Sequence, residues 1–106
     1  MSKTYSERRA AAYFTAARTL YTISADILDD VVLDTELLGR TLPWAVERAH
    51  ETRQQAILVE DTGRACISHQ PSPATERSLS QASARYHAAR TLLDQRLRRA
   101  QERTPV

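Results

Sequence analysis

Apolar side chains recur every seven residues in the first part of the chain, where Tyr13, Leu20 and Ile27 form one series. Seven residues make almost two turns of an α-helix, so residues at this spacing share one face. A second series begins one residue later and consists of Phe14, Tyr21 and Leu28. Four further residues fill the same face: Ala10, Ala17, Ser24 and Val31. Together the two series form a wide apolar stripe. The spacing therefore predicts a long helix over residues 4–30.

Polar residues suggest where this helix starts and stops. Thr4 followed by Glu7 has the spacing of a capping box, in which each side chain bonds a backbone N–H of the first turn. Asp29 and Asp30 favour the other end, because negative charge near a helix C-terminus opposes the helix dipole. We therefore expect the helix to end at Asp30.

The last third of the chain carries a second long stripe. Ser72 can cap a helix, and Pro73 suits its first position, so we expect a helix over 73–103. Its apolar positions alternate three and four residues apart: Leu79, Ala82, Tyr86, Ala89, Leu93, Leu97 and Ala100. This alternation is typical of helices that pack along a heptad seam. We expect this face to be buried against residues 10–28.

The rest of the chain contains too little helix to cover two long apolar stripes. The alanines between the large residues would allow another helix to approach closely. These features predict a homodimer formed by the two terminal helices. The expected interface residues are Tyr13, Leu20, Ile27, Leu79, Tyr86, Leu93 and Leu97.

The centre of the chain predicts a helical pair and a hairpin. Asp34 or Thr35 can cap a short helix that Gly39 closes, and Pro43 can start a second one, giving helices within 34–55. The stretch 56–68 combines strand formers with the turn sequence Asp61-Thr62-Gly63, which favours a β-hairpin. The alternative is that the second helix continues to Thr62 with Gly63 as its C-cap. The expected fold is thus mainly α with one hairpin, in a single domain of residues 1–106.

This order of elements resembles the winged helix-turn-helix regulators of bacteria. The resemblance rests on the segments 33–38, 42–49 and 57–64, which correspond to first helix, second helix and wing. In that family the second helix enters the major groove and the wing contacts the backbone or minor groove. The resemblance implies a small dimeric DNA-binding transcriptional regulator whose partner is double-stranded DNA. The candidate contacts are Arg40, Thr41, Trp44, Arg48, Arg53 and Arg64.

A different function remains open, because charge is unevenly distributed along the chain. Residues 26–36 carry five carboxylates and no basic side chain, whereas residues 71–106 carry seven arginines against three carboxylates. Such asymmetry indicates either oriented contact with a charged partner or simply solvated helix faces. The alternative function is a phage- or plasmid-borne inhibitor or adaptor that binds a host protein through the acidic segment or its helical faces.

Composition narrows the remaining function classes. No apolar run approaches the roughly 18 residues that span a membrane, and we expect a cytoplasmic protein. Cys66 and His69 have the spacing of two metal ligands, but the sequence offers no second pair to complete a site. Asp29 and Asp30 are adjacent, so on a helix they point about 100° apart and do not form a catalytic pair of carboxylates. Only two glycines are present, which leaves no phosphate-binding loop. We expect no enzyme activity, metal or cofactor.

Overall fold

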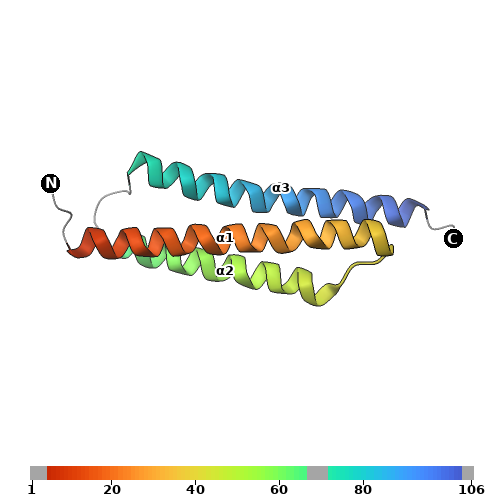
Figure 1. The fold of residues 1–106 in the computed structure, drawn as a ribbon, viewed down its shortest axis with the longest axis horizontal. Helices are drawn as coiled ribbons and strands as arrows, with labels where there is room; N and C mark the ends of the chain where they lie inside the picture. Colours follow the sequence, from red (N-terminus) through yellow and green to blue (C-terminus); the bar gives the residue numbers. More distant parts are fainter. Residues whose placement is uncertain (1–4, 67–71, 104–106) are drawn as a thin grey trace.

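Three helices of unequal length, each antiparallel to the one before it, make up the described part of the chain. The structure is a computed structural model and describes residues 5–66 and 72–103. The helices are α1 (Tyr5–Leu38), α2 (Pro43–Ala65) and α3 (Pro73–Arg103). Figure 1 shows α2 running back along α1, and α3 running forward again in the direction of α1. The molecule measures 64 × 22 × 18 Å with a radius of gyration of 17.3 Å. A compact domain of this length would have about 13 Å, so the helices form a rod.

α1 is one unbroken helix, so the predicted end at Asp30 and the separate short helix after it are wrong. Two features explain its continuation. Arg85 of α3 pairs with Asp29, which lowers the cost of negative charge there. The Thr35 hydroxyl donates to the Val31 carbonyl at 2.7 Å, as helix-interior threonines do, instead of capping a new helix. The predicted start at Thr4 lies outside the described residues.

Gly39 ends α1, as the sequence predicts. Its φ is +69°, a left-handed conformation that suits glycine. Its N–H donates to the Thr35 carbonyl at 3.0 Å, which is the bond of the αL C-cap motif. The start of α2 at Pro43 is likewise confirmed, with Leu42 as its N-cap.

The predicted β-hairpin is wrong, because residues 56–65 belong to α2. The buried residues of α2 are all small: Ala45, Ala49, Ala56 and Gly63. Their spacings of four and seven residues place them on one helical face, which α1 covers. Gly63 is neither a turn residue nor a C-cap, and its φ is not positive. The alternative of a helix to Thr62 is closer to the structure, but it also stops too early. Residues 67 and 68 of the predicted hairpin lie outside the described residues.

Gly63 allows α1 and α2 to approach closely. A Cβ atom at this position would lie 3.0 Å from Phe14 Cε1 and 3.0 Å from Tyr13 Cβ. Real Cβ atoms seldom have contacts this short, so a larger residue would push the two helices apart. The glycine is therefore used for interhelical packing, where the sequence suggested a turn.

α3 begins as predicted. The Ser72 hydroxyl accepts a hydrogen bond from the Thr75 backbone N–H at 3.3 Å, and Pro73 occupies the first helical position. The predicted apolar positions of α3 face inward: Leu79, Ala82, Tyr86, Ala89 and Leu93 are buried.

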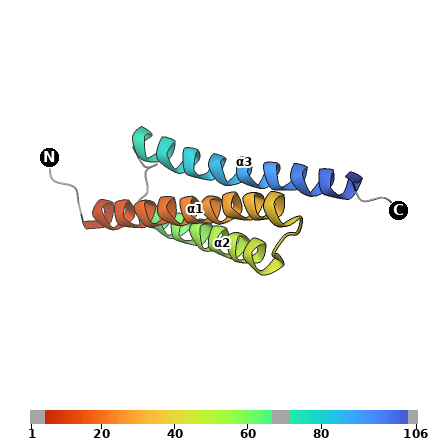
Figure 2. The same cartoon turned by 45° about the vertical axis from the view of Figure 1, so that its right-hand side comes forward.

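α1 occupies the middle of the arrangement, with α2 and α3 on two of its sides (Figures 1 and 2). Eight of its ten buried positions follow a four–three spacing: Ala10, Phe14, Ala17, Tyr21, Ser24, Leu28, Val31 and Thr35. The other two, Ala25 and Val32, each follow a member of this series. The core divides into two clusters along the rod, one around Phe14 and Leu79, the other around Leu28 and Leu93. Within the described ranges, no Cα atoms of α2 and α3 approach within 8 Å, so long side chains must bridge these two helices.

Candidate functional site

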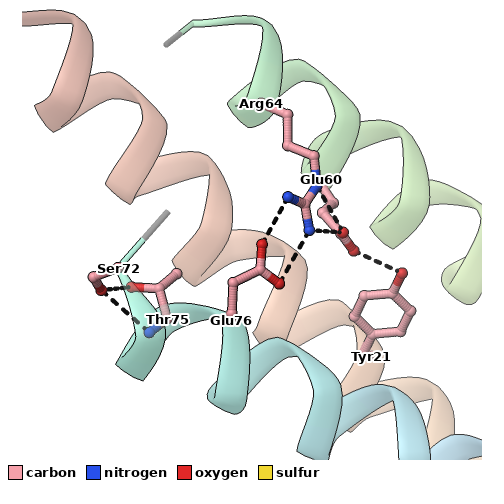
Figure 3. A network of polar contacts seen from close by, with 6 residues as sticks. All are labelled: Tyr21, Glu60, Arg64, Ser72, Thr75 and Glu76. Atoms are coloured by element: carbon pink, nitrogen blue, oxygen red, sulfur yellow. Dashed lines mark hydrogen bonds and ion pairs between the residues drawn. The ribbon is translucent and has the colours of Figure 1, made fainter. Parts of the chain in front are cut away.

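A cluster of charged residues joins the three helices near the start of α3. Figure 3 shows Arg64 of α2 between two carboxylates, Glu60 on its own helix and Glu76 on α3. Arg64 Nη1 lies 2.7 Å from Glu76 Oε1, and Nη2 lies 2.9 Å from Glu60 Oε2. Tyr21 of α1 donates to the other oxygen of Glu60 at 3.0 Å. One guanidinium group thus connects α2 to α3, and Glu60 connects both to α1.

The electrostatics of this cluster suit a structural connection. Hydrogen bonds from Arg64 to Glu76 and Glu60 raise the pKa of Arg64 above its ordinary value. Burial, helped by the charge of Glu60, raises the pKa of Tyr21 to about 12. The guanidinium N–H groups of Arg64 already donate to the carboxylates of Glu60 and Glu76, so few donors remain for a phosphate. The groove beside the cluster, about 440 Å³, is lined by these residues and by serines and His87 of α3.

A second polar contact bridges α2 and α3 further along the rod. His50 Nδ1 is hydrogen-bonded to the Tyr86 hydroxyl, and Arg53 Cζ lies 5.1 Å above the Tyr86 ring. Burial, followed by the charges of Arg90 and Arg53, lowers the pKa of His50. Tyr86 is only 1% exposed, and a buried tyrosine needs a partner for its hydroxyl. His50 supplies that partner.

The residues predicted to contact DNA do not form one surface. Arg53 and Arg64 lie on the side of α2 that meets α3, where Arg64 is engaged by two carboxylates. Arg48 is exposed, and its distance of five residues from Arg53 turns it about 140° to another side. Arg40 and Trp44 are also exposed, and Thr41 shares a hydrogen bond of 3.0 Å with Thr35. Because the hairpin is helical, Arg64 is not at a wing tip.

The residues predicted for a dimer interface divide into two groups. Leu79, Tyr86 and Leu93 are buried within the single chain, and Leu97 packs partly against the same core. Burial of the α3 stripe therefore requires no second copy. The other group, Tyr13, Leu20 and Ile27, is only half-buried.

Part of the charge asymmetry is neutralised between α1 and α3. Arg85 pairs with Asp26 and with Asp29, the latter at 3.1 Å. Arg96 Nε lies 2.6 Å from Glu36 Oε1. Because α1 and α3 run in the same direction, the acidic end of one lies beside the basic end of the other. The acidic segment is thus not a wholly unpaired surface awaiting a partner.

The best candidate site is an apolar surface along one side of α1 and α2, which we call the outer α1–α2 face. It consists of Leu20, Ile23 and Ile27 of α1 and of Trp44 of α2. Ile23 is 43% exposed and Trp44 64%. Leu20 and Ile27 are half-buried and pack against the two core clusters. Sequence reasoning identified Leu20 and Ile27 but missed Ile23, whose spacing of three and four residues from them places it on the same ridge.

The helical period places Trp44 on this face and Leu58 outside it. On α2, the side chains of His50, Arg53 and Arg64 reach toward α3. Trp44 lies nine residues before Arg53, about 180° away, and therefore on the flank of α2 that faces away from α3. Leu58 lies two residues after Ala56, which faces α1, so it points to the side of α2 opposite α1. Sequence reasoning interpreted Leu58 as a strand residue, whereas it is an exposed helical residue.

Other candidate sites have less to support them. Further exposed leucines, Leu33, Leu37 and Leu38, occupy only the last two turns of α1. In the part of the chain that the structure describes, no three His, Cys, Asp or Glu side chains come together as metal ligands would. Cys66 is half-buried, and its suggested co-ligand His69 lies outside the described residues. None of the described helices combines the length and apolar character needed to cross a membrane.

Comparison with known proteins identifies no relative. No family model, no curated protein and no solved structure matches this chain.

Proposed function

We propose that this chain is a helical protein-binding module that docks another protein on the outer α1–α2 face. The observation that carries the proposal is the exposure of two large apolar side chains, Ile23 and Trp44, beside a half-buried ridge on α1. Single exposed apolar residues are common on proteins, but grouped ones are typical of interaction surfaces. Tryptophan and large aliphatic residues are also the side chains that anchor protein interfaces.

DNA binding has less support on this fold. Its strongest argument was a wing carrying Arg64, and that residue lies in helix α2 between Glu60 and Glu76. Phosphate contacts would also compete with Glu47 and Glu51, which lie on the same helix. A mobility-shift assay at physiological salt separates the two functions, because the protein-binding module should not shift duplex DNA.

Site-specific photo-crosslinking in the source cells tests the docking face. A photoreactive benzoylphenylalanine at position 44 lies on the face, whereas the same residue at position 88 replaces an exposed alanine of α3. We expect a covalent protein adduct from position 44 and none from position 88. Adding Ile23→Glu to the position 44 variant should abolish the adduct, because a carboxylate on the ridge would have to be buried in the interface.

Two outcomes would contradict the proposal. Adducts of equal yield from positions 44 and 88 would indicate non-specific contact. No adduct at position 44, with normal folding shown by circular dichroism, would mean that the face has no protein partner under those conditions of growth.

A further inference from the structure

We infer that the occupant of the outer α1–α2 face is a second copy of this chain. In this arrangement α1 packs antiparallel to the α1 helix of the second copy, across a two-fold axis at Leu20. The inference rests on the proposed function, in that it takes the face to be a docking surface and names its partner. A two-fold interface must be complementary to itself, so the side chains on either side of the axis have to match in position and in charge.

The apolar residues of α1 meet this condition. Tyr13 precedes Leu20 by seven residues, and Ile27 follows it by seven. With α1 antiparallel to its copy, Tyr13 lies opposite the second copy's Ile27, and Leu20 lies opposite itself. Ile23, which protrudes from the face, comes near the second copy's Ala16, an exposed small residue that leaves room for it. Large side chains are thus matched by partners that they can pack against.

The charges at the ends of the ridge are complementary in the same register. Arg9 precedes Leu20 by eleven residues and is exposed. Asp30 follows Leu20 by ten residues, and Asp34 lies one turn further. Each Arg9 therefore comes close to Asp30 of the other copy. Within the described residues, Arg85 and Arg96 pair with Asp26, Asp29 and Glu36, whereas neither Asp30 nor Asp34 takes part in an ion pair.

Charge reversal with rescue tests the antiparallel register. The variants Arg9→Asp and Asp30→Arg each place like charges opposite one another at two symmetric points. We expect each to raise the dimer dissociation constant about tenfold in sedimentation equilibrium at low salt. The double variant R9D/D30R restores opposite charges and should return the dissociation constant to within about twofold of the parent. Arg77→Asp on the exposed side of α3 is the matched control and should change nothing.

Disulfide trapping tests the position of the axis. In a Cys66→Ala background, Leu20→Cys should form a covalent dimer under mild oxidation, because Leu20 lies opposite itself at the axis and the two introduced thiols are therefore close. Ala88→Cys is the control and should form no covalent dimer. A parent chain that is monomeric at all accessible concentrations would overturn the inference, as would a dimer insensitive to both charge reversals.

The cellular crosslinking experiment distinguishes failure of this inference from failure of the proposed function. An adduct at position 44 with twice the chain mass supports the second copy. A monomeric chain whose position 44 crosslinks to a different protein overturns the homodimer and leaves the protein-binding module standing. A monomeric chain with no adduct at position 44 overturns both.

Discussion

The two helices that pack on α1 bury side chains of different size. The buried residues of α2 are all small, namely Ala45, Ala49, Ala56 and Gly63, whereas α3 alternates large Leu79, Tyr86 and Leu93 with small Ala82 and Ala89. Small residues bury little apolar area themselves, but they let the backbone of α2 come close to the large residues of α1. Large residues bury more apolar area per side chain. The α1–α2 contact thus depends on the small size of the α2 residues, and the α1–α3 contact depends on the burial of large α3 residues. The two contacts should therefore respond differently to mutation.

The largest effect is expected on the α3 side. Leu93 is 2% exposed, so Leu93→Ala should lower the free energy of unfolding by about 2–5 kcal/mol through lost burial and a new cavity. The neighbouring Leu92, 39% exposed, is the matched control, and its replacement by alanine should have a much smaller effect. Urea denaturation measures both. Equal losses for the two variants would mean that α3 does not present Leu93 to the core.

The α1–α2 contact should fail in the opposite way, when volume is added. Gly63→Leu places atoms where Phe14 and Tyr13 already lie and should cost about 1–3 kcal/mol of unfolding free energy. This loss should occur although leucine favours a helix more than glycine does. Ala65→Leu, two residues later at an exposed position, is the control and should be neutral or slightly stabilising. If the two leucine variants proved equally stable, close approach at Gly63 would not be needed.

The smallest effect concerns the polar bridge between α2 and α3. Burial and nearby arginines lower the pKa of His50 in the folded chain below about 6.5, the value expected in the unfolded chain. The unfolded chain therefore takes up the proton first as the pH falls. The stability contributed by neutral His50 is present above about pH 6.5 and is lost on acidification below that value.

NMR titration of the His50 ring should give a pKa below about 6.5. His50→Gln keeps a hydrogen-bonding group near Tyr86, and it should flatten the dependence of unfolding free energy on pH between about 7 and 5. His87→Gln, at an exposed position of α3, serves as the control. A His50 pKa that is not lowered, or a pH dependence that the His50 variant leaves unchanged, would show that the bridge is solvated.

The sequence by itself determined the features that depend on a few neighbouring residues. The seven-residue series of α1 and the stripe of α3 predicted two long helices and most of their buried positions, because the helical period places such residues on one face. Gly39, Pro43 and Ser72 predicted helix ends correctly, since capping acts within a single turn. For the candidate site, the same series indicated Leu20 and Ile27 as members of an apolar ridge.

Only the tertiary structure decided what depends on distant partners. α1 continues past Asp29 beside Arg85, which lies 56 residues away in the sequence. Residues 56–65 carry strand formers and a turn-like glycine, yet they are helical because α1 packs against Ala56 and Gly63. The exposure of Ile23 and Leu58 was likewise undetermined, since an apolar residue on a helix is core or surface according to which helices lie beside it. Local patterns encode a helix and its apolar side, but the neighbours that bury that side come from elsewhere in the chain.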